Sequence, residues 1–210
     1  FKPLHATLPL RERLCACGGG LVGLLVTAFV LRFCFGSFGR VPLLIAPLGA
    51  STVLVFGVPA SPLAQPWSVV AGNVIAALIG VTAVRFIADP YLAGAVAVSA
   101  TIAITSLLGC LHPPAGAVAL TAIIGGPAIA EAGYSFALVP VALSSLLLVA
   151  TGIVFNNLAH RSYPHVVALP VSLHGTADAP PEFRVGFSPA DIVAALERLG
   201  TPLDVEREDL

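Results

Sequence analysis

Long apolar stretches alternate with short polar or proline-rich segments along most of the chain. Four of these stretches, residues 14–31, 67–88, 91–108 and 134–155, contain almost only apolar residues. A helix that crosses the hydrocarbon core of a bilayer needs about 20 mostly apolar residues, and each stretch is close to that length. The pattern therefore predicts four membrane-spanning helices in an all-α, polytopic membrane helix bundle.

Two shorter apolar stretches lie between the predicted spans, and each is interrupted at its start by proline and glycine. They cover residues 41–58 and 115–124. When the chain is shifted by 67 residues, the pair Gly49 and Ala50 falls on Gly116 and Ala117. The shift indicates a tandem pseudo-repeat of span, broken half-helix and span. Interrupted hydrophobic segments at matching places in two halves point to a transport site near the middle of the membrane, so the two broken segments are expected to meet there.

Two topologies agree with this pattern. If the broken half-helices are re-entrant, four spans remain and both chain ends are cytoplasmic. The basic residues inside are then Lys2, Arg11, Arg13, Arg85 and Arg161, and those outside are Arg32 and Arg40. If the half-helices cross fully, six spans form an inverted repeat and Arg85 moves outside. Because basic residues collect on the cytoplasmic side, the count favours four spans with two re-entrant half-helices, and the six-span alternative stays open.

Composition agrees with an integral membrane protein and argues against several other classes. The chain has 210 residues, of which 57% are hydrophobic and 10% charged, and its mean hydropathy is +0.97. Between residues 46 and 133 only Arg85, Asp89 and Glu131 carry a charge, and the first two are expected to pair. The predicted partner is therefore the lipid bilayer, and no nucleic acid is expected. Motifs for catalysis, metal binding or phosphate binding do not occur, so no enzyme activity, metal or cofactor is expected.

The stretch that begins at His112 is the strongest candidate for a binding site. Pro113 and Pro114 favour the first turn of a helix, where no backbone donor is needed from them. The next backbone amides belong to Ala115, Gly116 and Ala117. If they are free, they form a positive pole that can bind an anion, and the imidazole adds a donor or a charge. The alternative is that the two prolines only kink a helix and His112 bonds a carbonyl freed by the kink.

The first broken segment repeats this pattern without a histidine. Pro47 and Gly49 stand at its start, Ala50 follows, and the hydroxyls of Ser51 and Thr52 are candidate hydrogen-bond donors. Two such poles facing each other would form a dry, hydrogen-bonding site that suits a small monovalent inorganic anion. The hydroxyls can equally bond back to the preceding turn. Asn73, inside the second predicted span, is a further candidate for the site or a strut between helices.

Small residues form a stripe on the predicted span 67–88. Gly72, Ala76 and Gly80 recur every four residues and so lie on one helical face. Such a stripe permits close contact between helices. It joins either two helices of one subunit or two subunits of a homo-oligomer.

The composition changes after Asn156. Residues 1–156 are interpreted as the transmembrane domain, and the polar, proline-rich residues 157–187 as a juxtamembrane linker. Ser188 then offers an N-cap, Pro189 stands at the first helical position, and apolar residues follow on one face. Residues 188–210 are therefore expected to form a short cytoplasmic amphipathic helix against a surface that this chain does not supply.

Three motifs in this order resemble the HPP family of integral membrane proteins. They are Pro-x-Gly-Ala at 47–50, Ser-Pro-Leu-Ala-Gln-Pro at 61–66 and His-Pro-Pro-Ala-Gly-Ala at 112–117. The resemblance implies four spans and, from chloroplast and cyanobacterial members, nitrite transport. Bacterial members are often joined to a pair of cytoplasmic CBS domains, so it also implies a bacterial inner membrane and a tail at 188–210 that leads toward such a module.

Two functions follow from these observations and are kept side by side. The leading interpretation is membrane transport of a small monovalent anion, nitrite in particular, through a site at the half-helix starts. The alternative is an intramembrane sensor that signals to a CBS-type cytoplasmic domain.

Overall fold

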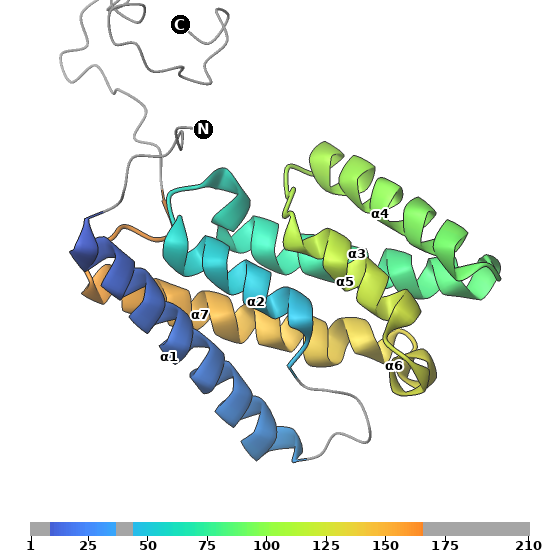
Figure 1. Cartoon of the computed structure of the whole chain (residues 1–210), viewed down its shortest axis with the longest axis horizontal. Coiled ribbons are helices and arrows are strands. Elements are labelled where there is room, and N and C mark those ends of the chain that lie inside the picture. Colours follow the sequence, from blue (N-terminus) through green and yellow to red (C-terminus); the bar gives the residue numbers. More distant parts are fainter. Residues whose placement is uncertain (1–8, 37–43, 166–210) are drawn as a thin grey trace, which may run out of the picture. The chain divides into compact units, whose positions relative to one another are not determined.

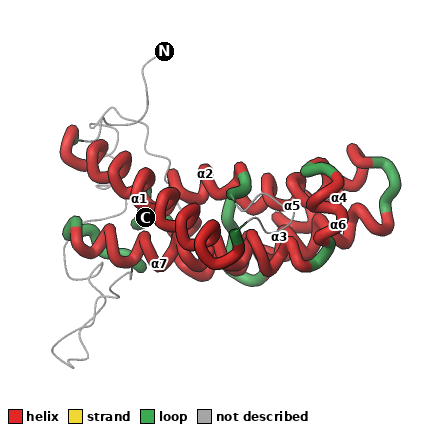
Figure 2. Tube along the Cα trace, turned by 90° about the horizontal axis from the view of Figure 1, so that it is seen from below, coloured by secondary structure: helices red, strands yellow, loops and turns green. Residues whose placement is uncertain are grey.

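A computed structural model describes residues 9–36 and 44–165, and these residues are almost entirely helical (Figure 2). The long helices are α1 (Leu10–Phe35), α3 (Pro66–Phe86), α4 (Pro90–Leu107) and α7 (Leu143–Leu158). A π-helical segment, η3 (Ala137–Ala142), extends α7 at its start. Counted together with η3, these helices are long and apolar enough to cross a membrane. The four predicted spans and the all-α class are confirmed.

The two broken segments form shorter helices, as predicted. α2 (Ala46–Thr52) continues into the π-helical turn η1 (Val53–Gly57), and α5 (Pro114–Ile124) forms the second. Each begins with proline in its first turn, where the missing N–H costs nothing. A short 3₁₀ turn, η2 (Pro62–Ala64), precedes α3, and α6 (Pro127–Ala132) follows α5.

The directions of the short helices correct one part of the topology. Gly72 of α3 lies beside His112, and Gly80 lies beside Ala119 and Ala122, so α5 runs parallel to α3. Val55 lies against Gly152, and Asn73 joins Ser51 to Ser145, so α2 and η1 run parallel to α7.

Neighbouring contacts fix the remaining directions. Gly19 lies beside Phe155 and Gly23 beside Leu148, so α1 is antiparallel to α7. Tyr134, just before η3 and α7, reaches Thr82 near the end of α3, so α3 is antiparallel to α7 as well. α1 and α3 are thus parallel, and the chain returns between them through α2 and η1. The half-helices carry the chain from one end of the bundle to the other rather than turning back, as Figure 1 also shows for α2 and α5.

This arrangement is the inverted repeat that the sequence left open. Because α1 and α3 run the same way, Arg85 at the end of α3 shares a side with Arg32 at the end of α1. The count of basic residues had favoured the other side for Arg85. The expected pair of Arg85 with Asp89 is also wrong: Arg85 lies 4.6 Å from the centre of the Tyr134 ring, while Asp89 Oδ1 accepts from the Leu92 amide and caps α4.

Burial of side chains repeats at the same 67-residue shift. Positions 44–55 and 111–122 show the same order of buried, half-buried and exposed residues at twelve consecutive positions. The two short helices therefore present equivalent faces to the core and to the outside. Ile45 is the counterpart of His112, and both are buried. The halves are alike in packing and differ in chemistry at this position.

The stripe of small residues on α3 packs within the chain. A Cβ atom on Gly72 would lie 2.8 Å from the Cys110 carbonyl oxygen, and one on Gly80 would lie 2.5 Å from the Ala119 carbonyl oxygen. Ala76 between them is fully buried. Because the turn before α5 and α5 itself cover this face at Gly72 and Gly80, the stripe joins two helices of one chain, the first of the two alternatives.

The bundle extends beyond the boundary predicted at residue 156. α7 ends at Leu158, and the residues after it turn back so that Tyr163 is only 1% exposed. The first part of the predicted 157–187 linker therefore belongs to the bundle. The rest of that linker and the predicted helix at 188–210 lie outside the described residues.

Candidate functional site

Four buried polar side chains meet where the two short helices approach each other. Ser51 Oγ lies 2.8 Å from His112 Nε2. Asn73 Nδ2 donates to Ser51 Oγ at 3.4 Å and to Ser145 Oγ at 3.1 Å. We call His112, Ser51, Asn73 and Ser145 the polar cluster. All four side chains are at most 2% exposed, so the polar cluster is shielded from water.

Four different parts of the chain position the cluster. Ser51 comes from α2, His112 from the turn before α5, Asn73 from α3 and Ser145 from α7. Gly72 permits the approach, because a Cβ there would lie 2.9 Å from the His112 Cβ. The predicted meeting of the two broken segments is confirmed by the bond between Ser51 and His112.

The hydrogen bonds of His112 define its tautomer. Nδ1 lies 2.8 Å from the carbonyl oxygen of Leu63, which can only accept, so Nδ1 carries the proton. In a neutral ring Nε2 is then an acceptor, and Ser51 donates its hydroxyl proton to it. Ser51 Oγ in turn accepts from Asn73. The polar cluster is thus a chain of hydrogen bonds with a defined direction and no net charge.

The backbone amides at the start of α5 are not free. Ala115 N donates to the His112 carbonyl oxygen at 2.8 Å, and Gly116 N donates to that of Pro113 at 3.2 Å. Pro113 and Ala117 are exposed, and Pro114 is buried. The proline pair closes the first turn on itself, so two of the three amides expected to bind an anion, those of Ala115 and Gly116, already have partners in this structure.

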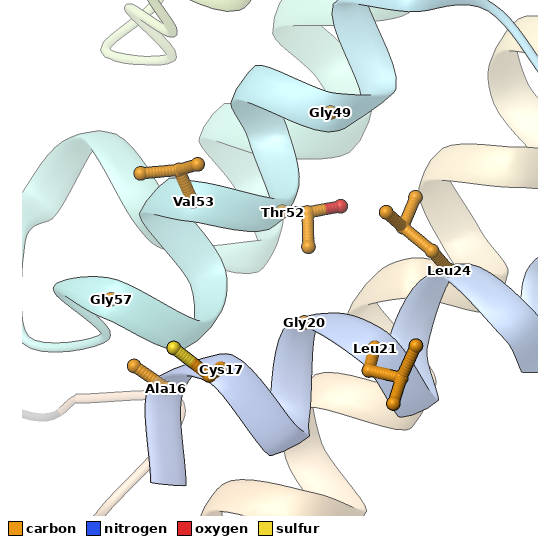
Figure 3. Close-up of a pocket in the computed structure, with 9 residues that line it drawn as sticks. All are labelled: Ala16, Cys17, Gly20, Leu21, Leu24, Gly49, Thr52, Val53 and Gly57. Atoms are coloured by element: carbon orange, nitrogen blue, oxygen red, sulfur yellow. The ribbon is translucent and has the colours of Figure 1, made fainter. Parts of the chain in front are cut away.

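The residues predicted in the first segment divide between two faces. Ser51 joins the polar cluster, whereas Thr52 bonds back to the Leu48 carbonyl oxygen at 2.8 Å. Ala50 is exposed. Gly49 and Thr52 face an apolar groove between α1 and the α2–η1 segment, shown in Figure 3. Of the residues proposed for the site, the structure therefore brings His112, Ser51 and Asn73 together.

Sequence reasoning missed two partners in the cluster. Ser145 carries a hydroxyl within an apolar span, and Ser144 beside it carries another. This pair of polar residues in an apolar stretch could have identified Ser145 as a candidate. The Leu63 carbonyl is a backbone atom, and no residue type signals it. The η2 turn that presents it does have Ser61 as its N-cap and Pro62 at its first position, and Ser61 Oγ accepts from the Leu63 amide.

One atom of the cluster has no partner among the described residues. Asn73 Oδ1 is buried without a hydrogen bond. Buried oxygens in native structures are nearly always bonded to protein, water or a ligand. The cluster therefore has an acceptor that can take one more hydrogen bond.

The fold and the cluster define a class: a polytopic helical membrane protein built as an inverted repeat with a polar core. Residues 5–164 match the family described as "HPP, transmembrane region", and the chain belongs to this family. It is 38% identical over 130 residues to a transmembrane protein of Dictyostelium discoideum, covering 60% of this chain and 45% of that protein. A second Dictyostelium transmembrane protein is 38% identical over 126 residues, covering 58% and 40%.

The chain thus spans less than half the length of these curated relatives. No solved structure matches it.

Proposed function

We propose that the protein moves a small monovalent anion, nitrite in particular, across the membrane, with both ends of the chain in the cytoplasm. The observation that supports this is a buried, uncharged polar cluster at the meeting point of two broken helices in an inverted repeat. Polar groups at membrane depth are costly and are usually retained for function. Sites at such meeting points are typical of secondary transporters.

The chemistry of the cluster favours a small anion on one of its sides. Ser145 Oγ accepts from Asn73 and keeps its own proton to donate to a ligand, whereas Ser51 and the amide nitrogen of Asn73 can donate to a ligand only by giving up a bond within the cluster. Asn73 Oδ1 would repel a bare anion, so we place the anion on the amide-nitrogen side. Neutral donors in a dry site compensate only part of the hydration of an ion, which favours a single charge over two.

Nothing in this proposal uses the α5 amides in their present bonds. For Ala115 and Gly116 to bind the anion, the first turn of α5 would have to release the carbonyls of His112 and Pro113. We therefore propose that the anion also contacts residues 113–117 in a second conformation, in which that turn is open. Gly49, Ala50 and Thr52 are proposed to bind the anion in the same second conformation.

Uptake into proteoliposomes tests the function. We expect vesicles that contain the full chain to accumulate nitrite faster than protein-free vesicles, and faster than they accumulate nitrate, formate or chloride. Equal rates with and without protein for all four anions would contradict transport. A ligand-dependent structural change without flux would instead support the sensor interpretation.

A further inference from the structure

The end of α7 and the residues that follow it are bonded to η1 and to the loop that joins η1 to α3. We call residues 156–165 the C-terminal strap and residues 55–65 the crossing loop. Three side chains of the strap donate to loop carbonyls: Asn156 Nδ2 to Val55 at 3.1 Å, Arg161 to Phe56 at 2.8 Å, and Tyr163 Oη to Ala64 at 2.8 Å. In addition, the His165 amide donates to Gln65 Oε1 at 2.9 Å.

These bonds have a physical cause. η1 ends at Gly57, and its last carbonyls have no partners further along the helix. Inside a membrane protein such groups must be satisfied internally, because lipid offers no hydrogen bonds. Val55 and Phe56 are buried, so the strap supplies the donors that the helix end lacks.

The bond from Tyr163 lies next to the polar cluster. Its acceptor, the Ala64 carbonyl, is adjacent in the chain to the Leu63 carbonyl, which accepts from His112 Nδ1. Both carbonyls belong to η2, a single 3₁₀ turn. Two side chains from distant parts of the sequence thus hold consecutive peptide groups of one short turn.

Tyr163 itself has little freedom to move. Its ring is 1% exposed and lies beside Gly152 of α7, where an added Cβ would be 3.3 Å from the ring. Asn157 holds its backbone, because Asn157 Nδ2 donates to the Tyr163 carbonyl. The hydroxyl is therefore a fixed donor at the end of a rigid side chain.

We propose that Tyr163 is a positioning residue for the polar cluster: by holding the η2 turn, it fixes the carbonyl that sets the tautomer of His112. If the turn shifts, Nδ1–H loses its acceptor and the ring is free to carry its proton on Nε2 instead. Nε2–H would then donate to Ser51, which could no longer donate in return. The direction of hydrogen bonding in the whole cluster thus depends on the strap.

Nitrogen NMR of the full chain, labelled with ¹⁵N-histidine, tests this inference independently of transport. The protein has five histidines, and the His112 signals are assigned by their loss in a His112→Asn variant. In the wild type we expect two well-separated ring-nitrogen signals from one neutral tautomer. Tyr163→Phe keeps the ring and removes the hydroxyl, and it is expected to move the two signals toward each other as the tautomers exchange.

Two further variants make the result decisive. Asn157→Ala, at an exposed position, loosens the Tyr163 backbone without touching the ring and should shift the His112 signals in the same direction, which also covers the case that Tyr163→Phe does not fold. Tyr134→Phe removes a tyrosine hydroxyl bond to Thr82, 3.1 Å long and far from η2 in the chain, and should leave the signals unchanged. Wild-type signals in Asn157→Ala and in any folded Tyr163→Phe, or equal shifts in Tyr134→Phe, would overturn the inference.

Discussion

Anion uptake is expected to fall by about tenfold or more in a His112→Asn variant that remains folded, which corresponds to about 1.4 kcal/mol. The asparagine amide nitrogen can take the place of Nδ1 and keep the bond to the Leu63 carbonyl. The shorter side chain is not expected to reach Ser51, so the polar cluster loses the acceptor at its His112 end. The variant thus separates a structural role of the histidine from its role in the cluster.

Initial uptake rates in proteoliposomes measure this effect, with elution volume and helical content as checks on folding. Gly18→Ala in α1 is the control, because it lies outside the proposed site and its added Cβ would meet only the Phe155 ring, at 3.9 Å. Wild-type uptake in His112→Asn would mean that the histidine serves the fold alone through its bond to Leu63.

Gly80→Ala is expected to lower the free energy of unfolding by about 1–3 kcal/mol, the usual cost of overpacking a tight core. The new Cβ would lie 2.5 Å from the Ala119 carbonyl oxygen and 2.8 Å from the Ala122 Cβ. Both belong to α5, and backbone atoms cannot move aside as a flexible side chain can. α3 and α5 would therefore have to separate.

Unfolding of the purified protein in detergent, followed by circular dichroism, gives the measurement. Gly49→Ala is the control, since no atom lies within 4 Å of its added Cβ and alanine favours a helix. We expect that variant to be as stable as the wild type or more so. Equal stability of Gly80→Ala and Gly49→Ala would show that α5 does not pack on α3 at this glycine.

Several features of the fold could be predicted from the sequence because the bilayer imposes them. A lipid-facing helix must be long and apolar, so the four spans were visible in the hydropathy pattern. Proline can start a helix but not continue one, which marked Pro47 and Pro114 as helix starts. The 67-residue shift revealed the repeat because each half must present the same faces to the core.

Other features could not be predicted. The directions of the half-helices depended on counting basic residues, and Arg85 alone separated the two alternatives, so the count was too weak to decide. The amides of Ala115 and Gly116 were expected to be free, but they donate to the carbonyls of His112 and Pro113. These two acceptors lie in the turn before the helix, and the sequence does not show how that turn is folded. The partner of His112 at Leu63 is a backbone atom and has no signature in residue type.

Each half crosses the bundle three times, first by α1, α2 with η1, and α3, then by α4, α5, and η3 with α7, and this bears on how the protein enters the membrane. A half that begins on one side ends on the other, so its repeat must insert the opposite way up. Between residues 44 and 133 the chain carries only Arg85, Asp89 and Glu131 as charged residues, so the middle of the sequence offers the insertion machinery almost no directional signal. We therefore expect the basic residues that flank α1, together with Arg161 after α7, to set the orientation of both halves.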